Sequence, residues 1–142
     1  MPANRKALIL DANILIRAVL GPKVRNLILD NAEKVRFFVP EVCFADAKKY
    51  LPEILSKKGL DPSLAIDVLD GLMNHIQLLE NDWLEDFEEP SRERMQSRDP
   101  DDWPVLAAAL ALDCPIWTQD ADFFGVGVVT WSTQHIESFF KR

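Results

Sequence analysis

The sequence predicts an α/β fold of three layers, in which helices cover both faces of a central, mostly parallel sheet of about five strands. The first observation is that short apolar segments alternate with longer segments of helical spacing along the chain. The second is that the short segments are continuously apolar, which is typical of strands buried on both faces. The length of 142 residues predicts one domain that spans residues 1–142.

Strands are expected at five places, residues 8–10, 35–39, 75–79, 116–118 and 127–131. Helices are expected at residues 14–20, 24–31, 41–57, 62–73, 83–87 and 105–112, and a last helix ends at residues 139–140. Gly21 and Pro22 are typical of the end of a helix, and Asp61 is placed to cap the fourth helix. Pro52 predicts a kink or restart in the third helix, and Pro90 predicts a break after the fifth.

The helix at residues 105–112 is apolar almost all round, so we expect it to be deeply packed. Asp101 or Asp102 is expected to cap it, and Ser132 or Thr133 is expected to cap the last helix.

Acidic residues occur where several of these elements should begin or end. Asp11 follows the first strand, Asp120 follows the fourth strand, and Asp102 opens the helix between the third and fourth strands. The carboxyl ends of parallel strands meet at one edge of a sheet, where ligands bind in folds of this class. Asp46, on the helix after the second strand, is the fourth candidate.

Converging carboxylates repel one another, and a bound cation would keep them ionised. Ligation by oxygen alone suits Mg²⁺ or Mn²⁺ better than zinc or copper. Such an ion activates water for attack on phosphorus, and a second ion nearby can stabilise the leaving oxygen. The two histidines are too few for a zinc site or a catalytic triad built on histidine, and the chain has no glycine-rich phosphate loop. The acidic residues therefore predict metal-assisted hydrolysis of a phosphodiester.

The composition narrows the class of protein further. A net charge of −7 argues against a nucleic-acid binder that relies on a broad basic surface. The two cysteines have no spacing that suggests a metal site, and no apolar run approaches the roughly 20 residues of a membrane span. A cytoplasmic protein without a membrane segment is the expectation.

Four segments resemble, in the same order, the motifs of the PIN domain family, the small nuclease fold found in toxins of VapC-type toxin–antitoxin pairs. They are residues 8–15 (LILDANIL), 39–47 (VPEVCFADA), 99–108 (DPDDWPVLAA) and 115–123 (PIWTQDADF). The chain departs from the family at Asp46, where the family most often has Glu. The Asp side chain reaches about 1.5 Å less, a single carbon–carbon bond. Glu41 is a fallback for this position, on a different face of the helix.

The resemblance implies catalytic roles for four acids, Asp11, Asp46, Asp102 and Asp120. It implies that the metal ligands, direct or through water, are Asp11, Asp102 and Asp120, with Asp122 as an auxiliary ligand or a ligand of a second metal. Asn13 and Thr118 would hold the carboxylates by hydrogen bonds. Arg17 and Arg98 are candidates for binding RNA phosphates, and Trp103 is expected either to stack a base or to pack in the core.

The function that the resemblance implies is a Mg²⁺- or Mn²⁺-dependent ribonuclease, in which a metal-activated water attacks the RNA. Its setting would be a homodimeric toxin that a small antitoxin with a basic tail holds in check. A second hypothesis is a degenerate PIN domain that binds RNA or protein without cleavage, because Asp46 replaces Glu. A third is a phosphatase with Asp11 as nucleophile, which is disfavoured because Asn13 occupies the place of a second Asp. Singly, each acid would also serve as a cap, a turn residue or a solvated side chain.

Overall fold

The computed structural model describes residues 5–142, so the first four residues of the expected domain lie outside the described part. Within it, five parallel strands form one sheet in the order β3-β2-β1-β4-β5. The strands are β1 (Lys6–Leu10), β2 (Val35–Pro40), β3 (Ile76–Leu79), β4 (Ile116–Trp117) and β5 (Thr130–Trp131). The prediction of a mostly parallel, five-stranded sheet is confirmed.

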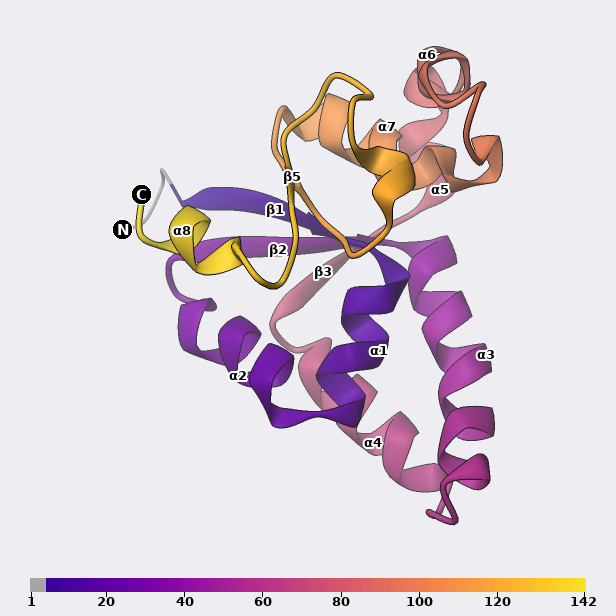
Figure 1. The fold of residues 1–142 in the computed structure, drawn as a ribbon, viewed down its shortest axis with the longest axis vertical. Helices are drawn as coiled ribbons and strands as arrows, with labels where there is room; N and C mark the ends of the chain where they lie inside the picture. The colour runs from indigo at the N-terminus through magenta and orange to yellow at the C-terminus, as the bar shows by residue number, and fades with distance from the viewer. Residues whose placement is uncertain (1–4) are drawn as a thin grey trace.

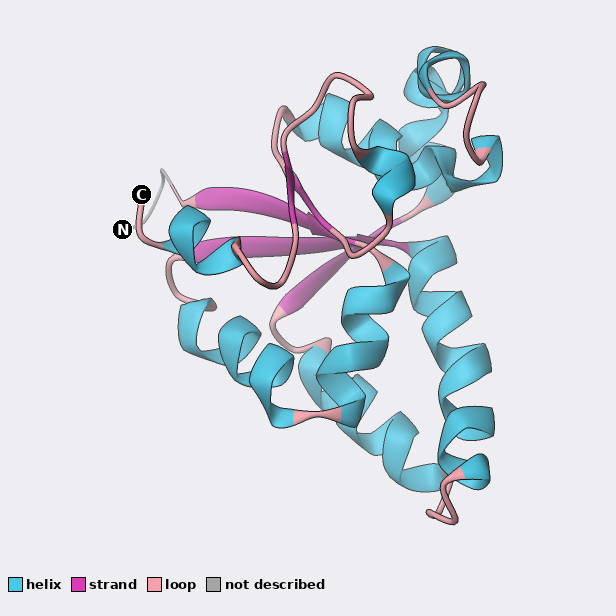
Figure 2. Cartoon of the chain, in the orientation of Figure 1, coloured by secondary structure: helices cyan, strands magenta, loops and turns pink. Residues whose placement is uncertain are grey.

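Helices lie on both faces of this sheet, as the three-layer prediction requires (Figure 1). One face carries α1 (Ala12–Leu20), α2 (Pro22–Asn31), α3 (Glu41–Lys57) and α4 (Ser63–Leu72). The other carries α5 (Asn81–Leu84), α6 (Glu88–Arg94) and α7 (Trp103–Leu112), with the short 3-10 helices η1 (Glu85–Phe87) and η2 (Pro100–Asp102). A third 3-10 helix, η3 (Ala121–Phe123), follows β4, and α8 (Ile136–Phe140) ends the fold. Figure 2 shows how the strands converge between the two groups of helices.

The central strand β1 forms the middle of the core. Leu8, Ile9 and Leu10 are fully buried, because helices cover both faces of the strand. Helix α7 packs against β1 and β2 and is buried from Trp103 to Ala109, which explains why it is apolar all round. The hydrophobic effect therefore fixes the two elements whose ends carry Asp11 and Asp102.

Two prolines do not act as the sequence predicts. Helix α3 continues through Pro52, although proline removes one hydrogen bond of the helix. Leu51 and Leu55 are buried on either side of it, and we attribute the continuity to this packing. Pro90 lies in the first turn of α6, where an N–H has no partner within the helix, so the break falls earlier, at η1.

The last strand and the last helix are both shorter than expected. Gly125 and Gly127 adopt positive φ angles of 84° and 93°, which end any extended run, so β5 begins only at Thr130. Thr133 does not cap α8. Its hydroxyl accepts a hydrogen bond from the Trp117 indole at 3.1 Å, and α8 begins three residues later.

Candidate functional site

The site lies at the ends of two neighbouring strands, β1 and β4, and the register between these strands brings its residues together. Leu10 of β1 is paired with Trp117 of β4. The next residues, Asp11 and Thr118, therefore emerge side by side at the carboxyl edge of the sheet. Thr118 Oγ1 donates a 2.7 Å hydrogen bond to Asp11 Oδ2. Both side chains are buried, with 8% of Asp11 and none of Thr118 exposed.

Further donors hold the Asp11 carboxylate in one orientation. The Ala12 backbone N–H donates to Oδ1 at 2.7 Å, so Asp11 caps α1. A helix cap is one of the roles that the sequence allowed for this residue. The Asn13 amide donates to Oδ2 at 3.1 Å, and the Cys43 thiol lies 3.8 Å from Oδ1. A buried carboxylate is stable only with such partners. The surrounding residues therefore orient Asp11 and offset part of the free-energy cost of burying its charge.

The same network orients the loop that follows β4. Asn13 Oδ1 accepts a hydrogen bond from the Gln119 N–H at 3.1 Å, and Thr118 Oγ1 accepts one from the Asp120 N–H at 2.9 Å. Asp120 Oδ1 in turn accepts from the Asp122 N–H at 2.9 Å and caps η3. The structure thus brings the two predicted supporting residues, Asn13 and Thr118, into contact with the predicted acids.

Three predicted ligands form a compact group. Asp102, Asp120 and Asp122 each offer a carboxylate oxygen, and these oxygens lie within 4.8 Å of one another. Asp102 directly precedes α7, yet its side chain makes no capping hydrogen bond, which leaves the carboxylate facing the other acids. Asp99 takes the capping role nearby, because its Oδ1 accepts from the Asp101 N–H at 3.1 Å.

Burial and mutual repulsion both act on these carboxylates. Burial, followed by the charges of Asp99, Asp11, Asp120 and Asp122, raises the pKa of Asp102 to about 7. Burial also raises the pKa of Asp11, with a smaller contribution from the Asp120 charge, while the Thr118 hydrogen bond opposes the rise. Carboxylate oxygens whose negative charge is not balanced by a nearby positive group are suitable ligands for a hard divalent cation such as Mg²⁺ or Mn²⁺.

Asp11, Asp102 and Asp120 line one pocket of about 410 Å³ at this edge of the sheet. Ile16, Val42 and Tyr50 form an apolar wall of the same pocket. Tyr50, Cys43 and Asp101 also line it, although none of them was predicted from the sequence as a pocket residue. Tyr50 was detectable in principle, since it follows Asp46 by four residues and shares its face of α3.

The second acid stands apart from the three-acid group. Asp46 is exposed and lines the pocket, but its carboxylate does not join the oxygens of Asp102, Asp120 and Asp122. The fallback Glu41 has another partner, because its Oε1 accepts a 2.8 Å hydrogen bond from the Asn81 N–H at the start of α5. Within the described residues, Glu41 therefore ties α3 to α5.

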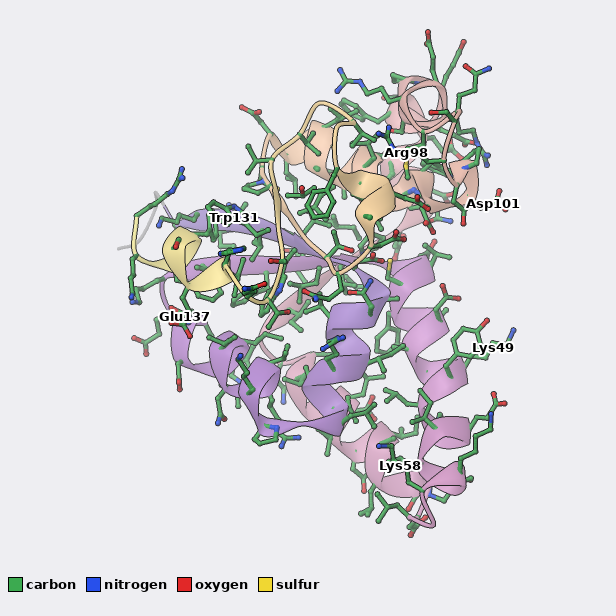
Figure 3. The ribbon with its side chains drawn as sticks, in the orientation of Figure 1. Lys49, Lys58, Arg98, Asp101, Trp131 and Glu137 are labelled. Atoms are coloured by element: carbon green, nitrogen blue, oxygen red, sulfur yellow. The ribbon has the colours of Figure 1, made fainter. Side chains whose placement is uncertain are left out.

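The remaining candidates lie outside the pocket. Arg17 and Arg98 are exposed and do not line it, and Arg98 lies beside Gly125 of the loop after η3 (Figure 3). Trp103 is buried, with the Arg92 guanidinium 5.6 Å from the centre of its ring. Of the two roles proposed for Trp103, packing is therefore the one that the structure shows. None of the helices described in residues 5–142 has the length and apolar character needed to cross a membrane.

Comparisons with known proteins agree with this architecture. Among solved structures, PAE2754 from Pyrobaculum aerophilum superposes with a TM-score of 0.71 at 16% identity, covering 99% of this chain and 98% of that chain. FitAcB from Neisseria gonorrhoeae gives 0.68 at 19% identity over 90% and 99%. VapBC2 from Rickettsia felis, bound to a DNA fragment from its promoter, gives 0.68 at 13% identity over 89% and 98%. At these identities the likeness concerns the fold.

No curated protein matches the chain at a significant level. The family model described as PIN domain matches residues 9–141, which include the acidic residues of the pocket and the strands that position them. The resemblance seen in the sequence is thereby confirmed, and the chain belongs to the PIN domain family.

Proposed function

We propose that this protein is a Mg²⁺- or Mn²⁺-dependent ribonuclease that hydrolyses RNA phosphodiester bonds. The observation that carries the proposal is the group formed by Asp102, Asp120 and Asp122 beside the buried Asp11. A bound divalent cation would supply activation of water and neutralisation of charge at the phosphate. Asp102, Asp120 and Asp122 would hold the cation, and Asp11 would do so directly or through water.

The protein's own residues would do the rest of the work. Thr118 and Asn13 fix the Asp11 carboxylate through hydrogen bonds of 2.7 and 3.1 Å, so Asp11 would already be oriented when a cation binds. The apolar wall with Ile16 and Tyr50 would accept a nucleotide base next to the cleaved phosphate. Arg17 and Arg98 would contact phosphates farther along the RNA.

The biological setting that we propose is the toxin of a type II toxin–antitoxin pair in the cytoplasm. The support is the fold shared with VapBC2 from Rickettsia felis and with a toxin–antitoxin complex from Klebsiella pneumoniae. The partner would be a small antitoxin whose basic tail enters the acidic pocket. The net charge of −7 on this chain would attract such a tail. Residues 1–142 would act as one domain, and two copies would form a homodimer.

Cleavage of a labelled single-stranded RNA in Mn²⁺ tests the activity. The wild type is expected to cleave. Asp120→Asn is expected to lose at least about a hundredfold in rate, because loss of a residue that only supports a metal ligand already costs about 10- to 100-fold and Asp120 would be a ligand itself. Asp67→Asn is the matched control, because Asp67 is exposed on α4 and does not line the pocket. Equal cleavage by wild type and Asp120→Asn would identify a contaminating nuclease.

One observation favours a second function, an RNA- or protein-binding PIN domain without cleavage. Asp46 is exposed and outside the three-acid group, as expected if its shorter side chain cannot reach the cation. This alternative predicts no cleavage by the wild type and no rise in Tm when Mn²⁺ is added. A rise in Tm without cleavage would show a cation site that lacks activity on the RNA tested.

A further inference from the structure

A second hollow lies at the opposite end of the sheet, at the amino ends of β2 and β3. Its volume is about 310 Å³. Its polar lining consists of Arg5, Arg36, Asn74, His75 and Gln77. The aromatic side chain of Phe38, which is 2% exposed, forms part of its floor. No carboxylate is among the described residues that line it, although the chain carries 23 acidic residues.

The two arginines of this hollow have few acceptors. Arg5 Nη1 makes one long hydrogen bond of 3.4 Å to the Ala32 carbonyl, while the buried Arg5 Nε has no partner among residues 5–142. The Arg36 guanidinium lies 5.1 Å from the centre of the Phe38 ring. Within the described chain, neither arginine forms an ion pair. Buried donors are normally satisfied, so the Arg5 side chain keeps hydrogen-bonding capacity that residues 5–142 leave unused beside this hollow.

The surroundings add positive charge. Lys6, at the start of β1, has its pKa lowered by burial and then by the positive charges of Arg142 and Lys34. These cations add to the positive charge of Arg5 and Arg36 at the amino end of the sheet. The acidic pocket occupies the carboxyl end, so the two groups of charged side chains lie at opposite ends of the sheet.

We infer that the hollow lined by Arg5, Arg36 and His75 binds a phosphate group, at a site separate from the acidic pocket. The planar guanidinium fork matches the oxygens of a phosphate, and Asn74 and Gln77 supply neutral donors beside it. The phosphate belongs either to a free ion or nucleotide, or to the backbone of an RNA strand. Strand β1 has five residues, about 17 Å at the usual rise, so one strand of RNA would need several nucleotides to reach both sites.

The test follows phosphate binding through a histidine signal and does not require nuclease activity. The chain has only two histidines, so the ring resonances of His75 and His135 are readily assigned by NMR. His75 lines the hollow and His135 does not. Inorganic phosphate, titrated against chloride at constant ionic strength in a chelating buffer, is expected to shift the His75 resonance with saturation and to leave His135 in place.

Variants then distinguish a specific phosphate-binding site from non-specific electrostatic attraction of phosphate. Arg36→Gln is expected to weaken phosphate binding by about tenfold or more, the loss of one charge-assisted contact. Arg36→Lys keeps the charge without the fork and should lie between Arg36→Gln and the wild type. Lys58→Gln, which makes the same change in net charge far away on the end of α3, should bind as the wild type does (Figure 3). Arg36 is exposed, so its variants are expected to fold, and circular dichroism checks this.

The source of the phosphate is resolved with a dinucleotide and a long single-stranded RNA in the same chelating buffer. Binding is read at the His75 resonance. If that shift saturates at a lower concentration of the long RNA than of the dinucleotide, and Arg36→Gln weakens it, the site belongs to RNA backbone, whereas equal or weaker binding of the long RNA assigns it to a free phosphate or nucleotide. The inference is overturned if His75 does not respond to any of these probes, or if Arg36→Gln and Lys58→Gln bind them alike. Cleavage assays do not enter either result, so the proposed nuclease can fail while this site stands.

Discussion

Thr118 Oγ1 donates to Asp11 Oδ2 at 2.7 Å, a contact between residues 107 positions apart that joins the ends of two neighbouring strands. The hydroxyl also accepts from the Asp120 N–H at 2.9 Å. A single side chain thus connects the buried acid on β1 with the loop that carries two other acids. The pocket depends on this contact both for its stability and for the placement of its acidic side chains.

The first prediction concerns Thr118→Val, which keeps the shape of the side chain and removes the hydroxyl. Asp11 Oδ2 would then keep only the Asn13 donor, and the free energy of unfolding should fall by about 1–3 kcal/mol, the cost of a buried polar group that loses its partner. Mn²⁺ affinity should fall by about tenfold or more. Urea unfolding and calorimetric titration measure the two effects. Thr118→Ser retains the hydroxyl and serves as the control, so equal losses in both variants would contradict this role.

The second prediction is a pH dependence that originates at Asp102. Its pKa in the folded protein is raised to about 7, mainly by burial and then by neighbouring carboxylates, from the ordinary value of 3.8 for an aspartate. A raised pKa means that the folded state holds the proton more tightly. The stability linked to that proton is therefore complete below the unfolded value and is lost as the pH rises through about 7.

Added Mn²⁺ competes with this proton, so the cation should raise Tm little at about pH 6 and much more at about pH 8. Without the cation, Tm should fall over the same range. Thermal unfolding with and without Mn²⁺ measures both trends. Asp102→Asn should flatten the metal-free trend and remove most of the Mn²⁺ effect, whereas Asp67→Asn should change neither. A Mn²⁺ effect that is constant with pH would exclude Asp102 as the titrating group.

The third prediction is that Asp46→Glu increases cleavage. Asp46 lines the pocket but lies outside the three-acid group, and Glu extends the carboxylate by about 1.5 Å. Because Asp46 is exposed, the change should not disturb the fold. Single-turnover cleavage in Mn²⁺ measures the rate, and Asp46→Gln provides the same length without the charge. A lower rate for Asp46→Glu than for the wild type would show that the shorter side chain is the adapted one.

The fourth prediction concerns the apolar wall of the pocket. Tyr50 is 43% exposed and lines the pocket together with the acids, so a base of the RNA would stack on its ring. Tyr50→Ala should raise KM by about tenfold, since one stacked base contributes roughly 1–3 kcal/mol. Tyr50→Phe keeps the ring and should retain the wild-type KM. If Mn²⁺ binding also weakened in Tyr50→Ala, the effect would lie in the fold of the pocket and not in base stacking.

Much of the fold follows from features that are local in sequence. The continuous apolar run ending at Leu10 predicts a buried strand, and the apolar helix before β4 predicts a deeply buried element, because hydrophobic burial leaves few alternatives for such segments. Pro52 and Gly127 were less predictable. The packing of Leu51 and Leu55 overrides the breaking tendency of Pro52, and the φ angle of Gly127 depends on how its loop crosses Arg94.

The acids of the pocket were predictable because each stands at the end of an element that a sequence pattern marks. Their order along the chain, together with the family resemblance, placed Asp11 and Asp120 at the same edge of the sheet. The separation between the exposed Asp46 and the three-acid group depends on where the side chains end, which no spacing along a helix specifies. Tyr50 was missed because an exposed aromatic residue gains meaning only from the pocket that it lines.

The pairing of β1 with β4 also has a consequence during synthesis on the ribosome. Asp11 is made before the partners that complete its surroundings at residues 102–122, and β4 can join β1 only after all the residues between them have been made. Contacts between such distant segments form late, because the long intervening loop must close first. A nascent chain that ends before β4 therefore carries an incomplete pocket, and the proposed cation site would not be assembled on the ribosome until translation has passed that strand.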